Sequence, residues 1–134
     1  MKARSAKAKG TRLEVLIAKR LRDAGLDKEA RRMVLSGGAE GFESDIRTSL
    51  PLSIEAKNQE TWKPLEYMEQ AQESANKTNK MPVVIMSKNR LTEPLVMMRL
   101  DDFVLILQRA FLENSTPLVT GSQAYTKHNQ LKGR

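Results

Sequence analysis

The stretch that decides the fold reads Leu-Ser-Ile-Glu-Ala-Lys-Asn-Gln and spans residues 52–59. Its apolar residues alternate with polar ones, so Ile54 and Ala56 fall on one side of an extended chain. A period of two is typical of a strand that buries one face in a core. Glu55 and Lys57 then lie side by side on the opposite face, where they are available for chemistry.

A second carboxylate is expected beside this pair. Asp45 lies on the preceding predicted strand, 44–47, and residues 48–51 read as a turn or a short extended link. Folded as a hairpin, the two strands bring Asp45 near Glu55 and Lys57. Two carboxylates suit a hard divalent cation, and a neighbouring lysine can orient a water molecule or stabilise charge on a phosphate. The alternative is an exposed strand face on which Glu55 simply pairs with Lys57.

Composition and charge indicate one domain with a polyanionic partner. The chain has 134 residues and no cysteine, which excludes disulfides, thiolate zinc sites and a cysteine nucleophile. No apolar run approaches the ~20 residues of a membrane span, and a cytoplasmic protein is expected. The formal net charge is +7. Because the basic residues are clustered, nucleic acid is favoured over a charge that only aids solubility.

Hydrophobic periodicity predicts the order helix, three strands, helix, two strands, helix. The predicted helices are 11–24, 64–76 and 102–112, and the predicted strands are 30–36, 44–47, 52–57, 81–86 and 95–100. This order predicts an α/β fold with a mixed central β-sheet flanked by helices. Residues 1–12 are interpreted as a basic flexible arm, 13–113 as the folded domain and 114–134 as a polar and basic tail. The inward-facing residues of the last helix are predicted to be Phe103, Ile106, Leu107 and Ala110.

Glu14 is a third acid of interest. At ~100° per residue it falls about 20° from Leu21 on the first helix, inside the apolar stripe. A carboxylate in that position is costly unless something pairs with it. Glu14 therefore either reaches water or a neighbour such as Arg12 from the edge of the stripe, or is aimed at the metal site.

The order of these features resembles the PD-(D/E)XK nuclease superfamily. Its motif reads here as Ser44-Asp45 followed by Glu55-X-Lys57, with Ser44 in place of the superfamily's proline. Within the superfamily, the chain resembles the small archaeal and phage Holliday junction resolvases. Those begin with a basic segment, a Glu-bearing helix, an Arg-rich first strand and a Gly/Ser loop. The corresponding residues here are Lys9-Gly10, Glu14, Arg31-Arg32 and Ser36-Gly37-Gly38.

The resemblance spans residues 9–112 and implies a fold and a set of partners. The fold would be a restriction-endonuclease-like αβββαβ core, making 13–113 a PD-(D/E)XK nuclease domain. The activity would be metal-dependent, structure-specific cleavage of DNA that resolves four-way junctions by paired nicks. The protein would be a homodimer in the cytoplasm of a prokaryotic or phage-infected host cell, with no membrane and no organic cofactor.

The resemblance also implies roles for individual residues. Asp45, Glu55 and Glu14 would bind Mg²⁺, for which Mn²⁺ would substitute, and Lys57 would assist the nucleophilic water. The glutamine beside the active site would be Gln70, and the competing choice is Gln72.

Basic residues near the predicted site are expected to contact DNA phosphates and to recognise DNA shape, because nothing here resembles a groove-reading helix. The predicted DNA-binding residues are Lys7, Lys9, Arg12, Arg31, Arg32, Ser36, Lys63, Lys88 and Arg90. Three alternatives stay open: a related nuclease acting on flap, nicked or duplex DNA, a non-catalytic DNA-binding module of the same fold, and an RNA-binding protein.

Overall fold

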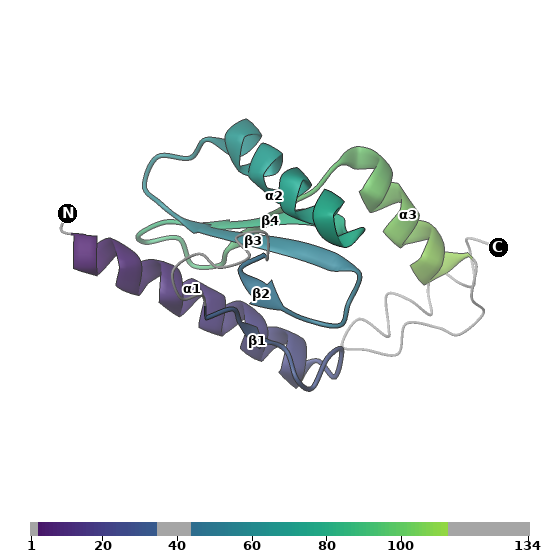
Figure 1. Ribbon diagram of the computed structural model, residues 1–134, viewed down its shortest axis with the longest axis horizontal. Coiled ribbons are helices and arrows are strands. Elements are labelled where there is room, and N and C mark those ends of the chain that lie inside the picture. The colour runs from purple at the N-terminus through teal and green to yellow at the C-terminus, as the bar shows by residue number, and fades with distance from the viewer. Residues whose placement is uncertain (1–2, 35–43, 113–134) are drawn as a thin grey trace. The chain divides into compact units, whose positions relative to one another are not determined.

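The structure is a computed structural model that describes residues 3–34 and 44–112, and only the backbone of residues 3–6. The chain divides into two compact units, 1–98 and 99–134. The first unit contains α1 (Ala3–Asp23), β1 (Arg31–Arg32), β2 (Ile46–Arg47), β3 (Leu52–Asn58), α2 (Pro64–Thr78), β4 (Met81–Ser87) and β5 (Leu95–Met97). The second unit contains α3 (Leu100–Phe111) (Figure 1). The predicted order of elements is confirmed.

The central sheet is mixed, as predicted. Its three strands have the order β3-β4-β5, with β3 parallel to β4 and β4 antiparallel to β5. The parallel register places Ile54 beside Val83 and Glu55 beside Val84. A separate two-stranded ladder joins β1 and β2, in which Arg31 lies opposite Arg47. The α/β class with helices flanking a mixed sheet is therefore confirmed.

Helices α1 and α2 cover opposite faces of the sheet (Figure 1). The alternation along β3 and β4 produces this arrangement, because neighbouring residues point to opposite faces. The cluster on the α1 side is Leu13, Ile17, Ile46, Ile54, Ala56 and Val83. The cluster on the α2 side is Tyr67, Met68, Ala71, Val84 and Met86. Each large apolar side chain buried there contributes about 1.5–3 kcal/mol by leaving water.

Helix α1 begins earlier than predicted. The expected start was Thr11, after a flexible basic arm, but the helix already begins at Ala3. Alanine is the strongest helix former, so the alanine-rich start favours helix despite its positive charge. The helix ends before Gly25, whose φ of +77° is a conformation that glycine adopts without strain.

Strands β2 and β3 do not form the regular hairpin that the sequence suggested. Strand β2 pairs with β1, and the backbone N–H of Asp45 donates to the carbonyl of Ile54 at 2.9 Å. The reason is the short length of β2, which has only two residues and is followed by a bend. Asp45 nevertheless reaches β3, as the hairpin reasoning required.

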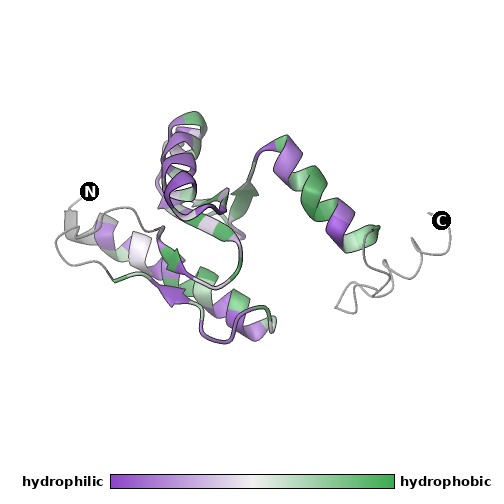
Figure 2. Cartoon of the chain, turned by 45° about the vertical axis from the view of Figure 1, so that its right-hand side comes forward, coloured by the Kyte–Doolittle hydropathy of each residue, from purple (hydrophilic) through white to green (hydrophobic). Residues whose placement is uncertain are grey.

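The prediction that the last helix packs inward is wrong for the part of the chain that the structure describes. Phe103, Ile106 and Leu107 keep 47%, 38% and 38% of their surface exposed, and Ala110 is only partly buried. Hydrophobic residues recur along α3 (Figure 2). The helix belongs to the second unit, and a 12-residue helix is too small to build a core of its own. Among the described residues, no helix has both the length and the apolarity to cross a membrane.

Candidate active site

Asp45 is fixed at the point where β2 approaches β3. Its N–H donates to the Ile54 carbonyl at 2.9 Å, and its own carbonyl accepts from the N–H of Met33 at 2.8 Å. Its carboxylate Oδ2 accepts from the N–H of Ala56 at 2.8 Å. Both the backbone and the side chain of Asp45 are thereby held against β3. Burial raises the pKa of Asp45, while the Ala56 N–H and then Lys57 oppose that rise.

Glu55 lies between two buried residues of β3 and points to the α2 side of the sheet. Its side chain is half-buried, unlike an ordinary exposed strand residue. Burial, reinforced by the negative charge of Asp45, raises the pKa of Glu55 to about 7, and Lys57 offsets only part of this effect. The charge of Asp45 therefore adds to burial in disfavouring the ionised form of Glu55.

Lys57 does not simply neutralise Glu55. Within the described residues no ion pair closer than 4.0 Å joins the two side chains. Instead, Lys57 Nζ lies 5.3 Å from the centre of the Tyr67 ring, a cation–π contact with α2. Tyr67 is buried, and its hydroxyl is hydrogen bonded to the side chain of Gln59. The alternative of an exposed, self-paired strand face therefore does not describe this site.

Glu14 approaches the same acids from α1. Burial, and then the charge of Asp45, raises its pKa, and Glu14 in turn raises the pKa of Glu55. Its Oε1 accepts a hydrogen bond from Arg32 Nε at 3.1 Å, with the two side chains 18% and 31% exposed. The pairing partner that the helix wheel required is thus Arg32, and not Arg12.

The donor set fits a hard cation that keeps open positions. Within the described residues, no group of three or more histidine, aspartate or glutamate side chains is arranged to hold a metal ion. Two carboxylates with open positions for water and phosphate are nevertheless a usual set for Mg²⁺. Asp45 and Glu55 could provide that set, and a bound cation would offset the burial that raises both pKa values and the charge of Asp45 that raises the pKa of Glu55 further. Glu14 stays paired with Arg32.

The two glutamines suggested for the helix next to the site lie on α2. Gln70 is exposed, and Gln72 Nε2 donates to Asn76 Oδ1 at 2.9 Å along the helix. Tyr67, also on α2, contacts the site through Lys57.

The predicted DNA-binding residues fall into distinct environments. Lys88 lies 4.7 Å from the centre of the Trp62 ring, and Arg32 is bound to Glu14. Ser36 lies outside the described residues. The exposed members are Lys7, Arg12, Arg31, Lys63 and Arg90.

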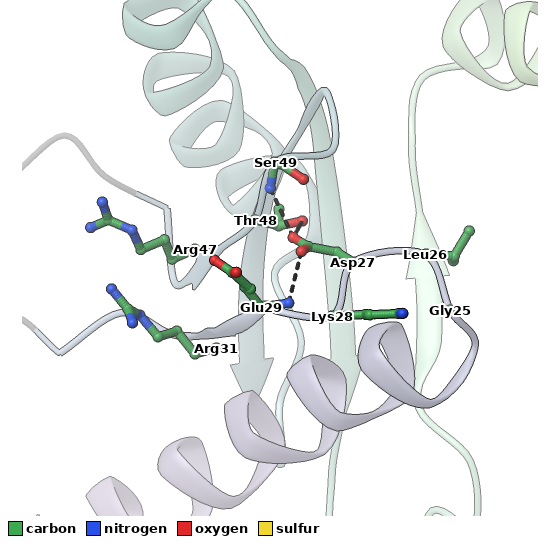
Figure 3. A pocket seen from close by; sticks show the side chains of 9 residues that line it. All are labelled: Gly25, Leu26, Asp27, Lys28, Glu29, Arg31, Arg47, Thr48 and Ser49. Carbon is green, nitrogen blue, oxygen red and sulfur yellow. Dashed lines mark hydrogen bonds between the residues drawn. The ribbon is translucent and has the colours of Figure 1, made fainter.

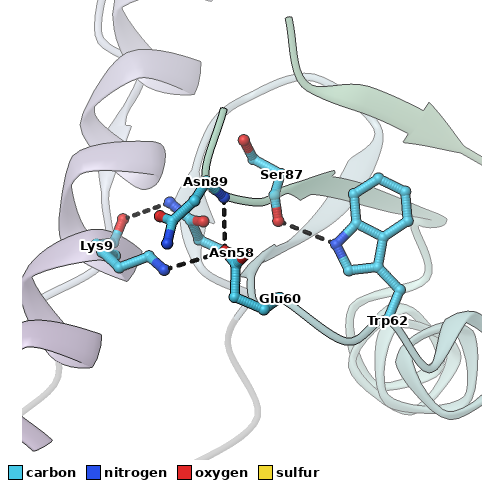
Figure 4. A network of polar contacts seen from close by, with 6 residues as sticks. All are labelled: Lys9, Asn58, Glu60, Trp62, Ser87 and Asn89. Carbon is cyan, nitrogen blue, oxygen red and sulfur yellow. Dashed lines mark hydrogen bonds and ion pairs between the residues drawn. The ribbon is translucent and has the colours of Figure 1, made fainter. Parts of the chain in front are cut away.

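Lys9 is not a surface charge. It is 7% exposed, and its Nζ lies 3.4 Å from Glu60 Oε2 (Figure 4). Asn58 Nδ2 donates to the Lys9 carbonyl at 3.1 Å, and the Asn89 N–H donates to Glu60. This network fixes α1 against the end of β3, so we leave Lys9 out of the proposed DNA surface.

Sequence reasoning missed three residues. Tyr67 supports Lys57, Asn58 joins β3 to α1, and Arg47 lies exposed opposite Arg31. A signal was present for Arg47, because it follows Asp45 by two residues on a strand that ends at the surface. Tyr67 gave a weaker signal, because the residues around it on the helix, Glu66 and Gln70, are polar.

A mixed sheet between helices, with two carboxylates and a lysine where β2 meets β3, is the arrangement of the PD-(D/E)XK nucleases. A comparison with protein families agrees, since residues 5–132 match the family described as "Phage putative PDDEXK endonuclease". The chain belongs to this family. Searches of curated proteins and of solved structures gave no match. The superfamily predicted from the sequence is confirmed, and the protein is a nuclease of the PD-(D/E)XK type.

Proposed function

We propose that the protein is a Mg²⁺-dependent DNA endonuclease that cuts four-way junctions by paired nicks. The observation that carries the catalytic part is the convergence of Asp45, Glu55 and Lys57 from two strands. Neither carboxylate forms an ion pair within 4.0 Å of its atoms among the described residues. Such partly desolvated acids, which Lys57 neutralises only in part, are typical of sites that serve a ligand.

The chemistry proposed is hydrolysis of a phosphodiester bond. Asp45 and Glu55 would hold the cation, and Lys57 would donate a hydrogen bond to the attacking water and stabilise the charge that develops on the phosphate. When bound, Mg²⁺ would supply charge neutralisation and a water of lowered pKa. Tyr67 would keep the Lys57 ammonium in place. Attack on phosphorus then forms one P–O bond and breaks the bond to the leaving oxygen.

The substrate part of the proposal is a four-way junction bound by a homodimer. It is supported by the resemblance to junction resolvases, by the net charge of +7 and by the absence of a groove-reading element in the sequence. Paired nicks need two sites, and the apolar residues of α3, none of them buried, offer a surface for a second copy. We place the protein in the cytoplasm of a prokaryotic or phage-infected cell.

The experiment compares cleavage of a synthetic four-way junction and a linear duplex of the same arm sequence, with Mg²⁺ or Mn²⁺. The wild type is expected to nick the junction symmetrically. Asp45→Asn keeps an acceptor for the Ala56 N–H and should lose about 10²-fold or more in rate while still binding DNA. Asp23→Asn is the matched control, because that exposed α1 acid pairs with Lys19 and is outside the proposed site, so its loss should leave the rate unchanged.

Each other outcome contradicts a defined part of the proposal. Equal cutting of junction and linear duplex contradicts the junction substrate and retains the nuclease. Binding without cleavage by the wild type in either metal contradicts catalysis. Preference for RNA junctions over DNA junctions contradicts the DNA substrate.

A further inference from the structure

Two arginines project together from the β1–β2 ladder. Arg31 and Arg47 are directly opposite each other in the antiparallel register, and both are exposed. Their guanidinium groups extend to the same side, away from Asp27 (Figure 3). Within the described residues, neither has an ion pair with an acid. Like charges directly opposite each other destabilise a strand pair, so the arrangement calls for an anionic ligand.

The segments that carry the arginines are fixed by Asp27. Its Oδ2 accepts from the Thr48 hydroxyl at 2.6 Å and from the Ser49 N–H at 2.9 Å. Its Oδ1 accepts from the Glu29 N–H at 3.0 Å. Asp27 thus joins the chain just before β1 to the chain just after β2, at the wall of a cleft of about 680 Å³ (Figure 3). The arginine pair is therefore presented by a braced ladder.

The arginine pair lies close to the catalytic acids. Arg47 follows Asp45 by two residues, which bounds the separation of their Cα atoms at about 7 Å. Arg31 precedes Met33 by two residues, and the Met33 N–H is bound to the Asp45 carbonyl. The pair is therefore the next exposed group along the ladder from the proposed cleavage site.

We propose that Arg31 and Arg47 form a fork that binds a DNA backbone phosphate adjacent to the one that is cut. This proposal rests on the proposed function and extends it to the substrate strand. Planar guanidinium groups bind phosphate oxygens in a bidentate manner, so two of them side by side match a phosphodiester. Glu29 also lines the cleft and limits its net charge, which favours a singly charged phosphodiester over a more highly charged free anion.

The test measures DNA affinity by fluorescence anisotropy of a labelled four-way junction. The buffer contains no metal, so no cleavage occurs, and the KCl concentration is varied from about 50 to about 300 mM. The plot of log affinity against log salt falls by about 0.9 per phosphate neutralised. Arg31→Gln/Arg47→Gln is expected to make this slope shallower by about 1 to 2 and to weaken binding. Arg31→Lys/Arg47→Lys keeps both positive charges, so most of the dependence of log affinity on log salt should remain. This variant should still bind more weakly than the wild type, because lysine lacks the planar fork of arginine.

The matched control is Lys19→Gln/Arg20→Gln, which removes the same charge from α1. Those residues already pair with Asp23 and Glu93, so the slope should stay near the wild-type value. An equal change of slope in the control, or none in the arginine variant, overturns the fork. Failure of the catalytic proposal would appear separately, as wild-type DNA binding without cleavage. Melting curves of each variant verify that the fold is retained.

Discussion

At the scale of the single residue, Glu55 is a half-buried carboxylate whose charged form is disfavoured by its surroundings. The alternation of β3 leaves its carboxylate half-buried, within the field of a second carboxylate, Asp45, just before β2. Its pKa of about 7 in the folded protein lies well above the ordinary value near 4.5. Ionised Glu55 therefore lowers stability at high pH, and this loss disappears as the pH falls through about 7 toward 4.5.

Glu55→Gln should stabilise the metal-free protein. At pH 8 the gain is expected to be on the order of 1–3 kcal/mol, because the substitution removes a buried charge and keeps the shape. At pH 4.5 the gain should nearly vanish, since wild-type Glu55 is then protonated. Thermal melts of the wild type and of Glu55→Gln, both with a chelator present and at the two pH values, measure this gain in stability. A gain independent of pH would show that packing and not charge is responsible.

Tyr67 should act on cleavage through Lys57. Tyr67→Phe keeps the ring below the ammonium and loses the hydroxyl contacts to Gln59 and Thr61, at a cost of about 1 kcal/mol. Tyr67→Leu removes the ring and should lower the rate about tenfold further, in line with loss of about 1 kcal/mol or more of cation–π attraction. Junction-cleavage rates at saturating Mg²⁺, with melting curves beside them, separate the two effects. Equal rates in both variants would remove Tyr67 from the positioning of Lys57.

At the scale of the element, the ladder of β1 and β2 depends on contacts outside its own two residue pairs. Asp27 braces it, and hydrogen bonds from Thr48, Ser49 and Glu29 lower the pKa of Asp27 to about 2. Its ordinary value is near 3.8. The carboxylate therefore contributes stability above about pH 4 that is lost as the pH falls through about 2.

Asp27→Ala is expected to lower the melting temperature at pH 6 and to weaken DNA binding along with it. The difference from wild type should shrink as the pH approaches 2, because wild-type Asp27 then becomes partly protonated. Thermal melts monitored by circular dichroism at several pH values between about 2 and about 6 measure how this difference in melting temperature depends on pH. An unchanged difference at all pH values would mean that the contribution of Asp27 does not come from its charge.

The elements show how far sequence reasoning reaches. Local alternation was enough for β3 and β4, because a buried face leaves a period-two pattern. It also placed Asp45 near Glu55, although it suggested a hairpin where the structure has a two-residue strand paired elsewhere. Long-range partners left no local signal: neither Arg32 as the partner of Glu14 nor Tyr67 below Lys57 follows from periodicity. Lys9 was predicted to contact DNA because its partner, Glu60, lies 51 residues away in the sequence and leaves no local signal.

At the scale of the whole molecule, α3 marks where the sequence was misleading. Its amphipathic pattern predicted an inward-facing helix of a single domain extending to 113, whereas it lies in a unit of its own. A pattern shows that a face is suited for burial but does not say what covers it. The same pattern supports the proposal that a second copy of the chain does so.

Phe103→Asp should therefore shift the protein from dimer to monomer. The exposed apolar face of α3 would carry a charge that a dimer interface has to desolvate. Sedimentation velocity at about 1–50 μM, bracketing a micromolar dissociation constant, measures the shift. Lys77→Asp, a charge change of the same sign on α2, is the control. A wild-type protein that is monomeric throughout would contradict the dimer.

The number of paired residues in each ladder determines which backbone hydrogen bonds near the site open first. Strands β3 and β4 are joined over seven residue pairs, whereas β1 and β2 are joined over two. Backbone amides of the short ladder should exchange with deuterium through local opening, well before those of β3, which require global unfolding. Glu55 thus lies in the part of the sheet with the most backbone pairing, and Asp45 lies beside the short ladder, which has less. The backbone hydrogen bonds next to Asp45 are then broken and re-formed more often than those that hold Glu55.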